Sequence, residues 1–171
     1  RAQSALYRQC FSILMGVCIR YAQQEEEAHS LLNQGFLKIL QKLDTRRENV
    51  PFEAWIRRIM INTIIDEYRR TKKYRETHRG IDQYTHTHLA HAVDWNEADR
   101  QFDAEAIENL LQRLPAMTRQ VFNLFAIDGY SHKEIAKMLN ISDGTSKWHV
   151  STARKQLQGM MATEVQNRLP L

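Results

Sequence analysis

The amino-acid sequence predicts an all-α protein with two small helical domains joined by a flexible linker. Glycine and proline are scarce, with six and three residues among 171. Apolar residues recur at helical spacing through both halves of the chain, as expected for amphipathic helices. This periodicity is lost between residues 74 and 102, where His, Thr, Gln and Asp accumulate. We therefore place the linker at 74–102 and the two domains at 1–73 and 103–171.

The first domain is expected to contain three helices, of which the first two cover about residues 3–23 and 28–43. Three consecutive glutamates, 25–27, precede the second helix and favour a helix N-terminus, where the helix dipole stabilises negative charge. Cys10 and Cys18 lie about 12 Å apart along the first helix, which is too far for a disulfide. We interpret both as small buried apolar residues of a protein in a reducing compartment.

The third helix of this domain is predicted to follow a loop. The polar stretch 44–51 ends in proline and is expected to form that loop. Apolar residues then recur at helical spacing from Phe52, so a helix is expected from there to about Lys72.

The second domain is predicted to contain four short helices, because stop and cap signals divide it. Pro115 and the Asp128–Gly129 turn end the first two helices. The pattern Ser131–Glu134 is a capping box that starts the third helix, and Asn140 closes that helix. Ser142 is expected to cap the last helix. Two short helices joined by a tight turn, the second with polar and basic side chains, predict a helix-turn-helix.

Charge is distributed unevenly along the chain, although the net charge is only +4. Residues 52–80 contain eight basic and four acidic residues, and residues 110–158 contain seven basic and three acidic residues. The intervening stretch 81–109 contains one basic and seven acidic residues. Two basic blocks on a tether suggest two modules that bind polyanions, although solvated helix faces are often basic as well.

Nothing in the sequence indicates a membrane protein. No apolar run approaches the roughly 18 residues that a membrane span needs. No charged-then-apolar leader opens the chain, so we expect a cytoplasmic protein without membrane insertion. The first residue is Arg1 rather than Met, and we expect some N-terminal sequence to be absent.

The second half of the chain carries four motifs: Leu114–Phe122 (LPAMTRQVF), Gly129–Ala136 (GYSHKEIA), Ile141–Lys147 (ISDGTSK) and Ala153–Leu157 (ARKQL). Together these motifs resemble region four of bacterial sigma factors, the module that reads the upstream promoter element. In the first half, Phe52–Asn62 (FEAWIRRIMIN) resembles the strand-opening segment of region two. The stretch Glu27–Leu37 resembles the preceding helix, which docks on RNA polymerase. With these two regions, the chain resembles the extracytoplasmic-function class.

The resemblance implies a factor that binds core RNA polymerase, recognises promoter DNA and promotes strand opening, with no enzymatic activity and no cofactor. An anti-sigma or recruiting protein is a further implied partner. In the docking helix the family usually carries an acidic residue and a Gln-Glu pair, whereas this chain has Ser30, Asn33 and Gln34. The glutamates 25–27 substitute in part for the missing carboxylates. The implied polymerase-binding residues are Glu27, Ser30, Leu31, Asn33, Gln34 and Lys38.

For promoter opening, the resemblance implies contacts from the loop 44–51 and the third helix. Extruded bases must be held by stacking and polar contacts. Asn62 matches the base-contacting position of the family and is an indifferent helix former. Trp55 shares an apolar face with Ile59 and can equally be a core residue. The basic end of the helix can equally be a solvated C-terminal turn whose cations interact with the helix dipole. The implied set is Arg46, Arg47, Asn49, Trp55, Arg58, Asn62, Arg69 and Arg70, with Lys72 and Lys73 beside the last two.

For the upstream element, a recognition helix needs side chains that reach base edges from its first turns, and cations for phosphates. Free backbone N–H groups at Gly144 and Thr145 suit a phosphate. Trp148 can instead pack in the core, since the family usually has a small or basic residue there. The candidates for base edges are Lys147, Trp148, Ser151 and Thr152, and those for phosphates and flanking contacts are Lys133, Thr145, Arg154 and Lys155.

Two other classes of protein remain as alternatives. A two-domain helix-turn-helix regulator without melting activity has a similar C-terminal motif, but it has no use for the segment Phe52–Asn62. For an enzyme, the only metal-like cluster is His86, His88 and His91 in the linker, without cysteine or carboxylate partners on a rigid frame. Because no nucleophile–base pair, phosphate loop or paired-carboxylate motif accompanies it, we expect neither catalysis nor a metal site.

Overall fold

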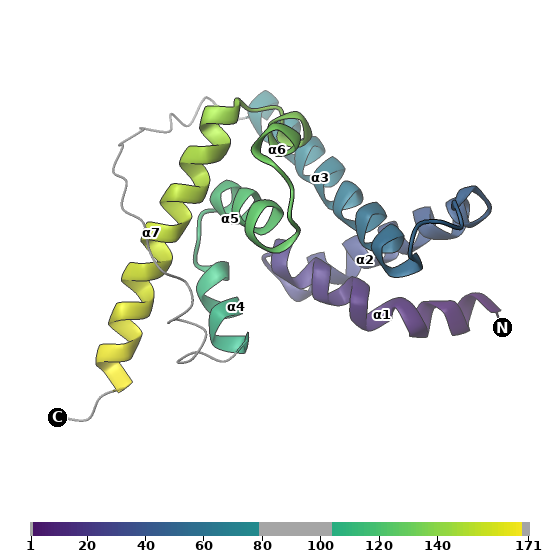
Figure 1. Ribbon diagram of the computed structural model, residues 1–171, viewed down its shortest axis with the longest axis horizontal. Helices are drawn as coiled ribbons and strands as arrows, with labels where there is room; N and C mark the ends of the chain where they lie inside the picture. The colour runs from purple at the N-terminus through teal and green to yellow at the C-terminus, as the bar shows by residue number, and fades with distance from the viewer. Residues whose placement is uncertain (1, 79–103, 169–171) are drawn as a thin grey trace. The chain divides into compact units, whose positions relative to one another are not determined.

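Helices form all the regular secondary structure in the part of the chain described by the computed structural model, residues 2–78 and 104–168 (Figure 1). The chain divides into two compact units, unit one (Arg1–Asp82) and unit two (Gln83–Leu171). This confirms the predicted all-α fold with two helical domains. None of the described helices is both long enough and apolar enough to span a membrane.

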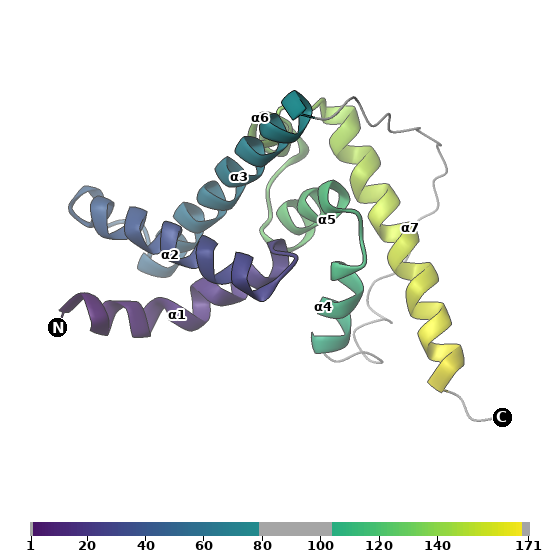
Figure 2. The same cartoon turned by 180° about the vertical axis from the view of Figure 1, so that it is seen from behind.

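Unit one consists of three helices, α1 (Ala2–Tyr21), α2 (Glu25–Lys42) and α3 (Phe52–His78), each of which packs against the other two (Figure 2). The short 3-10 turn η1 (Leu43–Thr45) follows α2. Apolar residues at helical spacing supply one buried stripe from each helix, as the periodicity predicted. The fully buried side chains include Leu14, Val17, Leu32, Ile39, Ile56 and Met60.

The ends of these helices follow local signals in the sequence. The predicted acidic N-terminus of α2 is confirmed, and the Glu27 carboxylate accepts a hydrogen bond of 2.7 Å from the backbone N–H of Gln23. The expected end of α3 near Lys72 is wrong, since the helix continues to His78. Neither glycine nor proline interrupts the sequence before Gly80, so no local signal stops it earlier. The rest of the predicted linker, including the three histidines, lies outside the described residues.

Gly35 of α2 faces the Met60 side chain of α3. A Cβ atom at this position would lie 2.3 Å from Cε of Met60, closer than real contacts allow. On its other side Met60 Sδ is 3.5 Å from Sγ of Cys18 on α1. Burial raises the pKa of the Cys18 thiol to about 12, so this thiol behaves as a small apolar group. Cys10 is also buried and free, as predicted for both cysteines.

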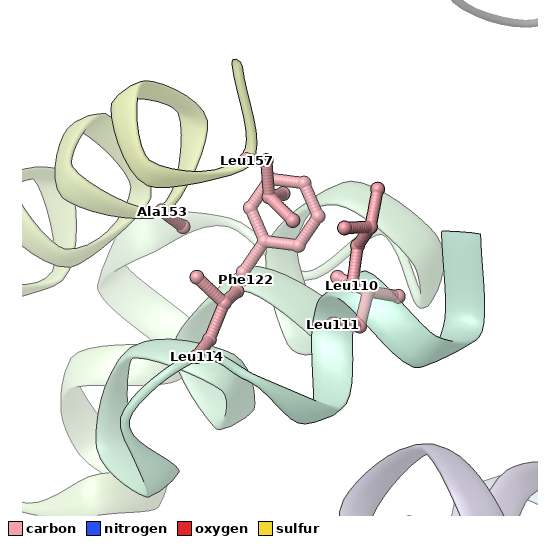
Figure 3. Packing of buried hydrophobic residues seen from close by; sticks show 6 residues of the cluster. All are labelled: Leu110, Leu111, Leu114, Phe122, Ala153 and Leu157. Atoms are coloured by element: carbon pink, nitrogen blue, oxygen red, sulfur yellow. The ribbon is translucent and has the colours of Figure 1, made fainter. Parts of the chain in front are cut away.

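Unit two contains α4 (Ala104–Gln112), α5 (Ala116–Phe122), α6 (His132–Leu139) and α7 (Asp143–Arg168). A π-helical turn, η3 (Asn123–Ile127), extends α5. The last helix passes through Leu157 and runs on to Arg168. Figure 3 shows Phe122 of α5 between α4 and α7, in the core formed with Leu110, Leu111, Leu114, Ala153 and Leu157.

The predicted helix-turn-helix caps are all present. The Ser131 hydroxyl accepts the backbone N–H of Glu134, whose carboxylate in turn accepts the N–H of Ser131 at 2.8 Å. Asn140 adopts a left-handed conformation with φ 54° and closes α6, as asparagine can do at small cost. The Ser142 hydroxyl accepts the backbone N–H of Thr145 at 2.9 Å and caps α7, so the expectation of a free N–H group at Thr145 for a phosphate is wrong. These local bonds fix the turn between the two helices.

Candidate nucleic-acid interface

Helix α7 has one face buried in unit two and another face exposed. The buried face repeats at helical spacing and comprises Ser146, His149, Val150, Ala153 and Leu157. On the opposite side Lys147, Ser151, Arg154 and Lys155 are exposed, while Thr145 and Thr152 are half-buried. Three of the four exposed side chains are cations, so this face can bind phosphates and present a hydroxyl to base edges.

The packing that was one interpretation of Trp148 is confirmed in part, whereas its contact with a base stays a prediction. Its side chain is half-buried, and its indole ring packs edge-on against His149 with the ring centroids 4.8 Å apart. The indole Nε1 atom is excluded from solvent. The N–H group is therefore not available to a base edge, and only the remaining edge of the ring can reach DNA.

Two histidine–hydroxyl pairs join α7 to the helices α5 and α6. Nδ1 of His149 lies 3.0 Å from the Thr118 hydroxyl of α5, and both side chains are buried. Nδ1 of His132 on α6 lies 3.0 Å from the buried Ser146 hydroxyl. The His132 ring also stacks on Phe125, with centroids 4.3 Å apart and planes inclined by 13°. Burial lowers the pKa of His132, which favours its neutral form. Local sequence signals did not indicate these pairs, because their partners lie far apart in the sequence.

The first turn of α7 carries an ion pair. Nζ of Lys147 lies 2.7 Å from the Asp143 carboxylate, with both side chains partly exposed. The hydrogen bond from Lys147 lowers the pKa of the Asp143 carboxyl group. Lys133, at the start of α6, is exposed and contributes to this lowering. Two exposed lysines of the helix-turn-helix, Lys147 and Lys133, therefore act on the Asp143 carboxylate. Asp143 was not among the residues predicted from the sequence.

In unit one, the side of α3 that carries the proposed base contacts is open to solvent. Trp55, Arg58 and Asn62 follow one another at a spacing of three and four, so they share one side of the helix. Arg58 and Asn62 are exposed, whereas Trp55 is half-buried and its ring lies 5.9 Å from that of Phe52. Trp55 therefore combines packing with partial exposure, and Asn62 is free to meet a ligand.

Of the three predicted residues in the loop before α3, one makes contacts within the loop and two are exposed to solvent. The Arg46 guanidinium donates a hydrogen bond of 2.9 Å to the backbone carbonyl of Val50 and lies 5.9 Å from the centre of the Phe52 ring. Arg46 therefore braces the loop, and its contacts leave it less available to DNA than predicted. Arg47 and Asn49 are exposed.

The C-terminal part of α3 carries the predicted basic residues. Arg69, Arg70, Lys72 and Lys73 are all exposed, and Arg70 forms an ion pair of 2.8 Å with Glu67. These cations lie on a regular helix, which spaces them for contacts along a phosphate backbone.

The outer side of α2 corresponds to the proposed polymerase-docking surface. Ser30, Asn33 and Gln34 are exposed, whereas Lys38 pairs with Asp66 of α3 at 3.3 Å. The docking role predicted for Leu31 does not fit the structure, because its side chain is 4% exposed and belongs to the core. Leu31 also belongs to the apolar stripe of α2, and this periodicity predicts that it is buried.

Leu37 is the surface residue of α2 that the sequence analysis overlooked. Its side chain is 56% exposed, more than any other large apolar side chain among the described residues. It lies three residues after Gln34 and therefore on the same side of the helix. That spacing was the signal that could have identified it. The tyrosine hydroxyl of Tyr7 and the Asn33 side-chain oxygen, 3.4 Å apart, join α1 to the edge of this surface.

No cluster of three or more possible metal ligands occurs among residues 2–78 and 104–168. The histidines 86, 88 and 91 lie outside these ranges.

Comparison with known proteins identifies the family. Residues 6–74 match the family described as Sigma-70 region 2, and residues 104–157 match Sigma-70, region 4. The chain is 32% identical over 136 residues to RNA polymerase sigma factor SigZ of Bacillus subtilis, an alignment that covers 77% of this chain and 70% of the relative. The chain belongs to the sigma factor family.

This sigma factor is also 28% identical over 149 residues to the ECF RNA polymerase sigma factor SigW of Bacillus subtilis, covering 83% of this chain and 79% of the relative. Among solved structures, the sigma factor RpoE from Bartonella quintana, in complex with the anti-sigma factor NepR, aligns with a TM-score of 0.54 and 20% identity. The alignment covers 92% of this sigma factor and 97% of that chain and supports the fold. The resemblance to regions two and four is confirmed.

Proposed function

We propose that this sigma factor binds core RNA polymerase through the outer side of α2 and holds melted promoter DNA with α3 and its preceding loop. It reads the upstream element with the exposed side of α7. The observation that supports this assignment is that all three surfaces lie opposite a buried core stripe and are open to solvent. Their polar side chains contribute little to folding, so their placement is better explained by contacts with partners.

The alternative of a regulator without melting activity is not favoured. Such a protein requires a helix-turn-helix but no region-two domain, and here region two matches residues 6–74. We assign polymerase docking and strand opening to the domain first placed at 1–73 and here extended to His78, and upstream recognition to the domain at 103–171. The protein acts as a non-enzymatic subunit in the cytoplasm, and an anti-sigma protein is a further proposed partner.

Co-purification with core RNA polymerase, followed by run-off transcription on genomic DNA fragments, tests the proposal. Leu37→Glu places a charge on the docking side of α2 and is expected to reduce co-purification without unfolding the chain. Ile19→Glu is the matched control, since Ile19 of α1 is 40% exposed but lies outside the proposed surface. Retention of wild-type binding by Leu37→Glu would remove α2 from the interface. A wild-type chain that neither co-purifies nor initiates would contradict the function itself.

A further inference from the structure

The carboxylate of Asp143 lies inside the proposed upstream-element interface, although it repels DNA. It forms a 2.7 Å ion pair with Lys147 one turn further along α7, and the two side chains are 40% and 62% exposed. Lys133, in the first turn of the neighbouring helix α6, also acts on it electrostatically, as does His132. A phosphate that approaches the cations at the start of these two helices therefore meets a negative charge among them.

We propose that Asp143 is a specificity-determining residue that keeps Lys147 from backbone phosphates and leaves it available to a base edge. This inference rests on the proposed function, because it assumes that α7 lies in the major groove.

The physical basis is the different charge of the two kinds of ligand. A phosphate carries a full negative charge and is repelled by the Asp143 carboxylate, and this repulsion acts on every DNA sequence alike. A base edge carries no net charge. The Lys147 ammonium group has three N–H donors, so two remain for acceptors such as O6 and N7 of guanine while the third stays on Asp143. The carboxylate therefore weakens non-specific binding more than specific binding.

The ion pair also orients Lys147. An unpaired lysine samples many rotamers on a flexible four-carbon stem. A hydrogen bond to Asp143, four residues earlier, directs the ammonium group toward the first turn of α7, from which a recognition helix reaches base edges. The orientation of Lys147 and the repulsion of phosphates by Asp143 thus both favour a base edge over a phosphate as the ligand of Lys147.

Fluorescence anisotropy of the full chain with a random-sequence DNA duplex tests the inference. Asp143→Asn is expected to tighten non-specific binding by about three- to tenfold and to steepen the salt dependence by about one unit. In a Lys147→Met background the same change is expected to give a clearly smaller gain, because the repulsion of phosphates is relieved but no ammonium group is released from Asp143. Asp143→Glu retains the charge and is expected to bind like the wild type. Thermal unfolding verifies that each variant is folded.

Glu164→Gln is the matched control for loss of one negative charge. Glu164 also lies in unit two, where it pairs with Arg113 at 3.5 Å. An equal gain from Glu164→Gln and Asp143→Asn, or a gain from Asp143→Asn that is undiminished without Lys147, would overturn the inference. If the wild type binds the duplex but Asp143→Asn changes nothing, only the role of Asp143 fails. If the wild type binds no duplex at all, the proposed function fails at its DNA-binding step.

Discussion

The Thr118 hydroxyl on α5 and Nδ1 of His149 on α7 lie 3.0 Å apart in the interior of unit two. Thr118 is 3% exposed and His149 is 5% exposed, so the two polar groups bond to each other in place of water. This bond joins α7 to the helix that precedes the helix-turn-helix, and together with the apolar residues of the buried face it holds α7 in its rotation about its axis. The exposed side of α7 therefore depends on a contact that lies beneath it.

Thr118→Val keeps the shape of the side chain but removes its hydroxyl. We expect it to lower the free energy of unfolding of unit two by about 1–3 kcal/mol, because the buried His149 loses a partner. Urea unfolding followed by circular dichroism measures the loss. Thr163→Val is the matched control, since the hydroxyl of the exposed Thr163 bonds only within its own helix, to the Gly159 carbonyl. Its expected effect is within about 0.5 kcal/mol, and similar losses from the two changes would refute the importance of the buried bond.

Gly35→Ala should force the end of the fully buried Met60 side chain to move, at a cost of about 1–3 kcal/mol, whereas alanine stabilises a helix by about 1 kcal/mol relative to glycine. We therefore expect a net destabilisation of unit one of up to about 2 kcal/mol. The loss should be smaller in a Met60→Ala background, which vacates that space. Thermal unfolding of the four chains gives the interaction free energy. Gly16→Ala provides the contrast, since a Cβ there has no neighbour within 4 Å and alanine favours the helix. A loss unchanged by Met60→Ala would mean that Met60 is not the obstacle.

The stability of unit two should depend on pH through His132. Burial lowers the pKa of its imidazole below the ordinary value of 6.5, so the folded state binds a proton less readily than the unfolded state. The stabilisation is complete above pH 6.5 and is lost as the pH falls through the folded pKa. Of the nearby charged groups, Asp143 opposes this lowering, whereas Lys147 and Arg154 add to it.

His132→Asn keeps a polar atom near Ser146 but does not titrate. Thermal unfolding above and below pH 6.5 should therefore show a smaller acid-induced loss in this variant than in the wild type. An unchanged pH dependence would assign the effect to other groups.

Asn62→Ala is expected to leave folding and duplex binding unchanged while reducing open-complex formation by the holoenzyme. Its amide is exposed on α3 and suited to a base edge. Permanganate footprinting measures opening, and a pre-melted mismatched bubble should restore most of the loss. Asn109→Ala, an exposed asparagine on α4, is the control. Equal impairment on duplex and bubble templates would argue against an opening role.

Lys155→Ala should weaken binding to all DNA sequences and lower the salt slope by about one unit, as loss of one phosphate contact does. Ser151→Ala and Trp148→Ala should instead change which promoters are preferred. Salt titrations of anisotropy and selection from genomic fragments distinguish the two effects. Arg8→Ala removes an exposed cation of α1 as a control. Intact DNA binding in all three α7 variants would mean that the recognition helix lies elsewhere.

The sequence was most informative where structure depends on near neighbours. The capping box at Ser131, the helix end at Asn140 and the Ser142 cap each involve bonds within a few residues, and all were predicted. Periodicity also places Leu31 in the core, but the family resemblance had favoured a surface role. In that case the physical pattern was the better guide.

Contacts between distant residues could not be predicted in the same way. The pairing of His132 with Ser146, and the bracing of the loop by Arg46, depend on how helices and turns pack. The end of α3 was also missed, because this helix continues through polar residues without an apolar period. The region-two and region-four motifs identified the family, whereas the support beneath its contact surfaces required the structure.

The reactivity of the two buried thiols can report how often unit one opens. The chain has two cysteines, and both lie in the core of unit one, so unit two contains none. A thiol whose pKa is raised by burial reacts slowly with alkylating reagents while the helices stay packed. Labelling of the unmodified protein therefore counts the openings of unit one alone. A single cysteine introduced on the surface of unit two would accept a dye without competition from the native pair.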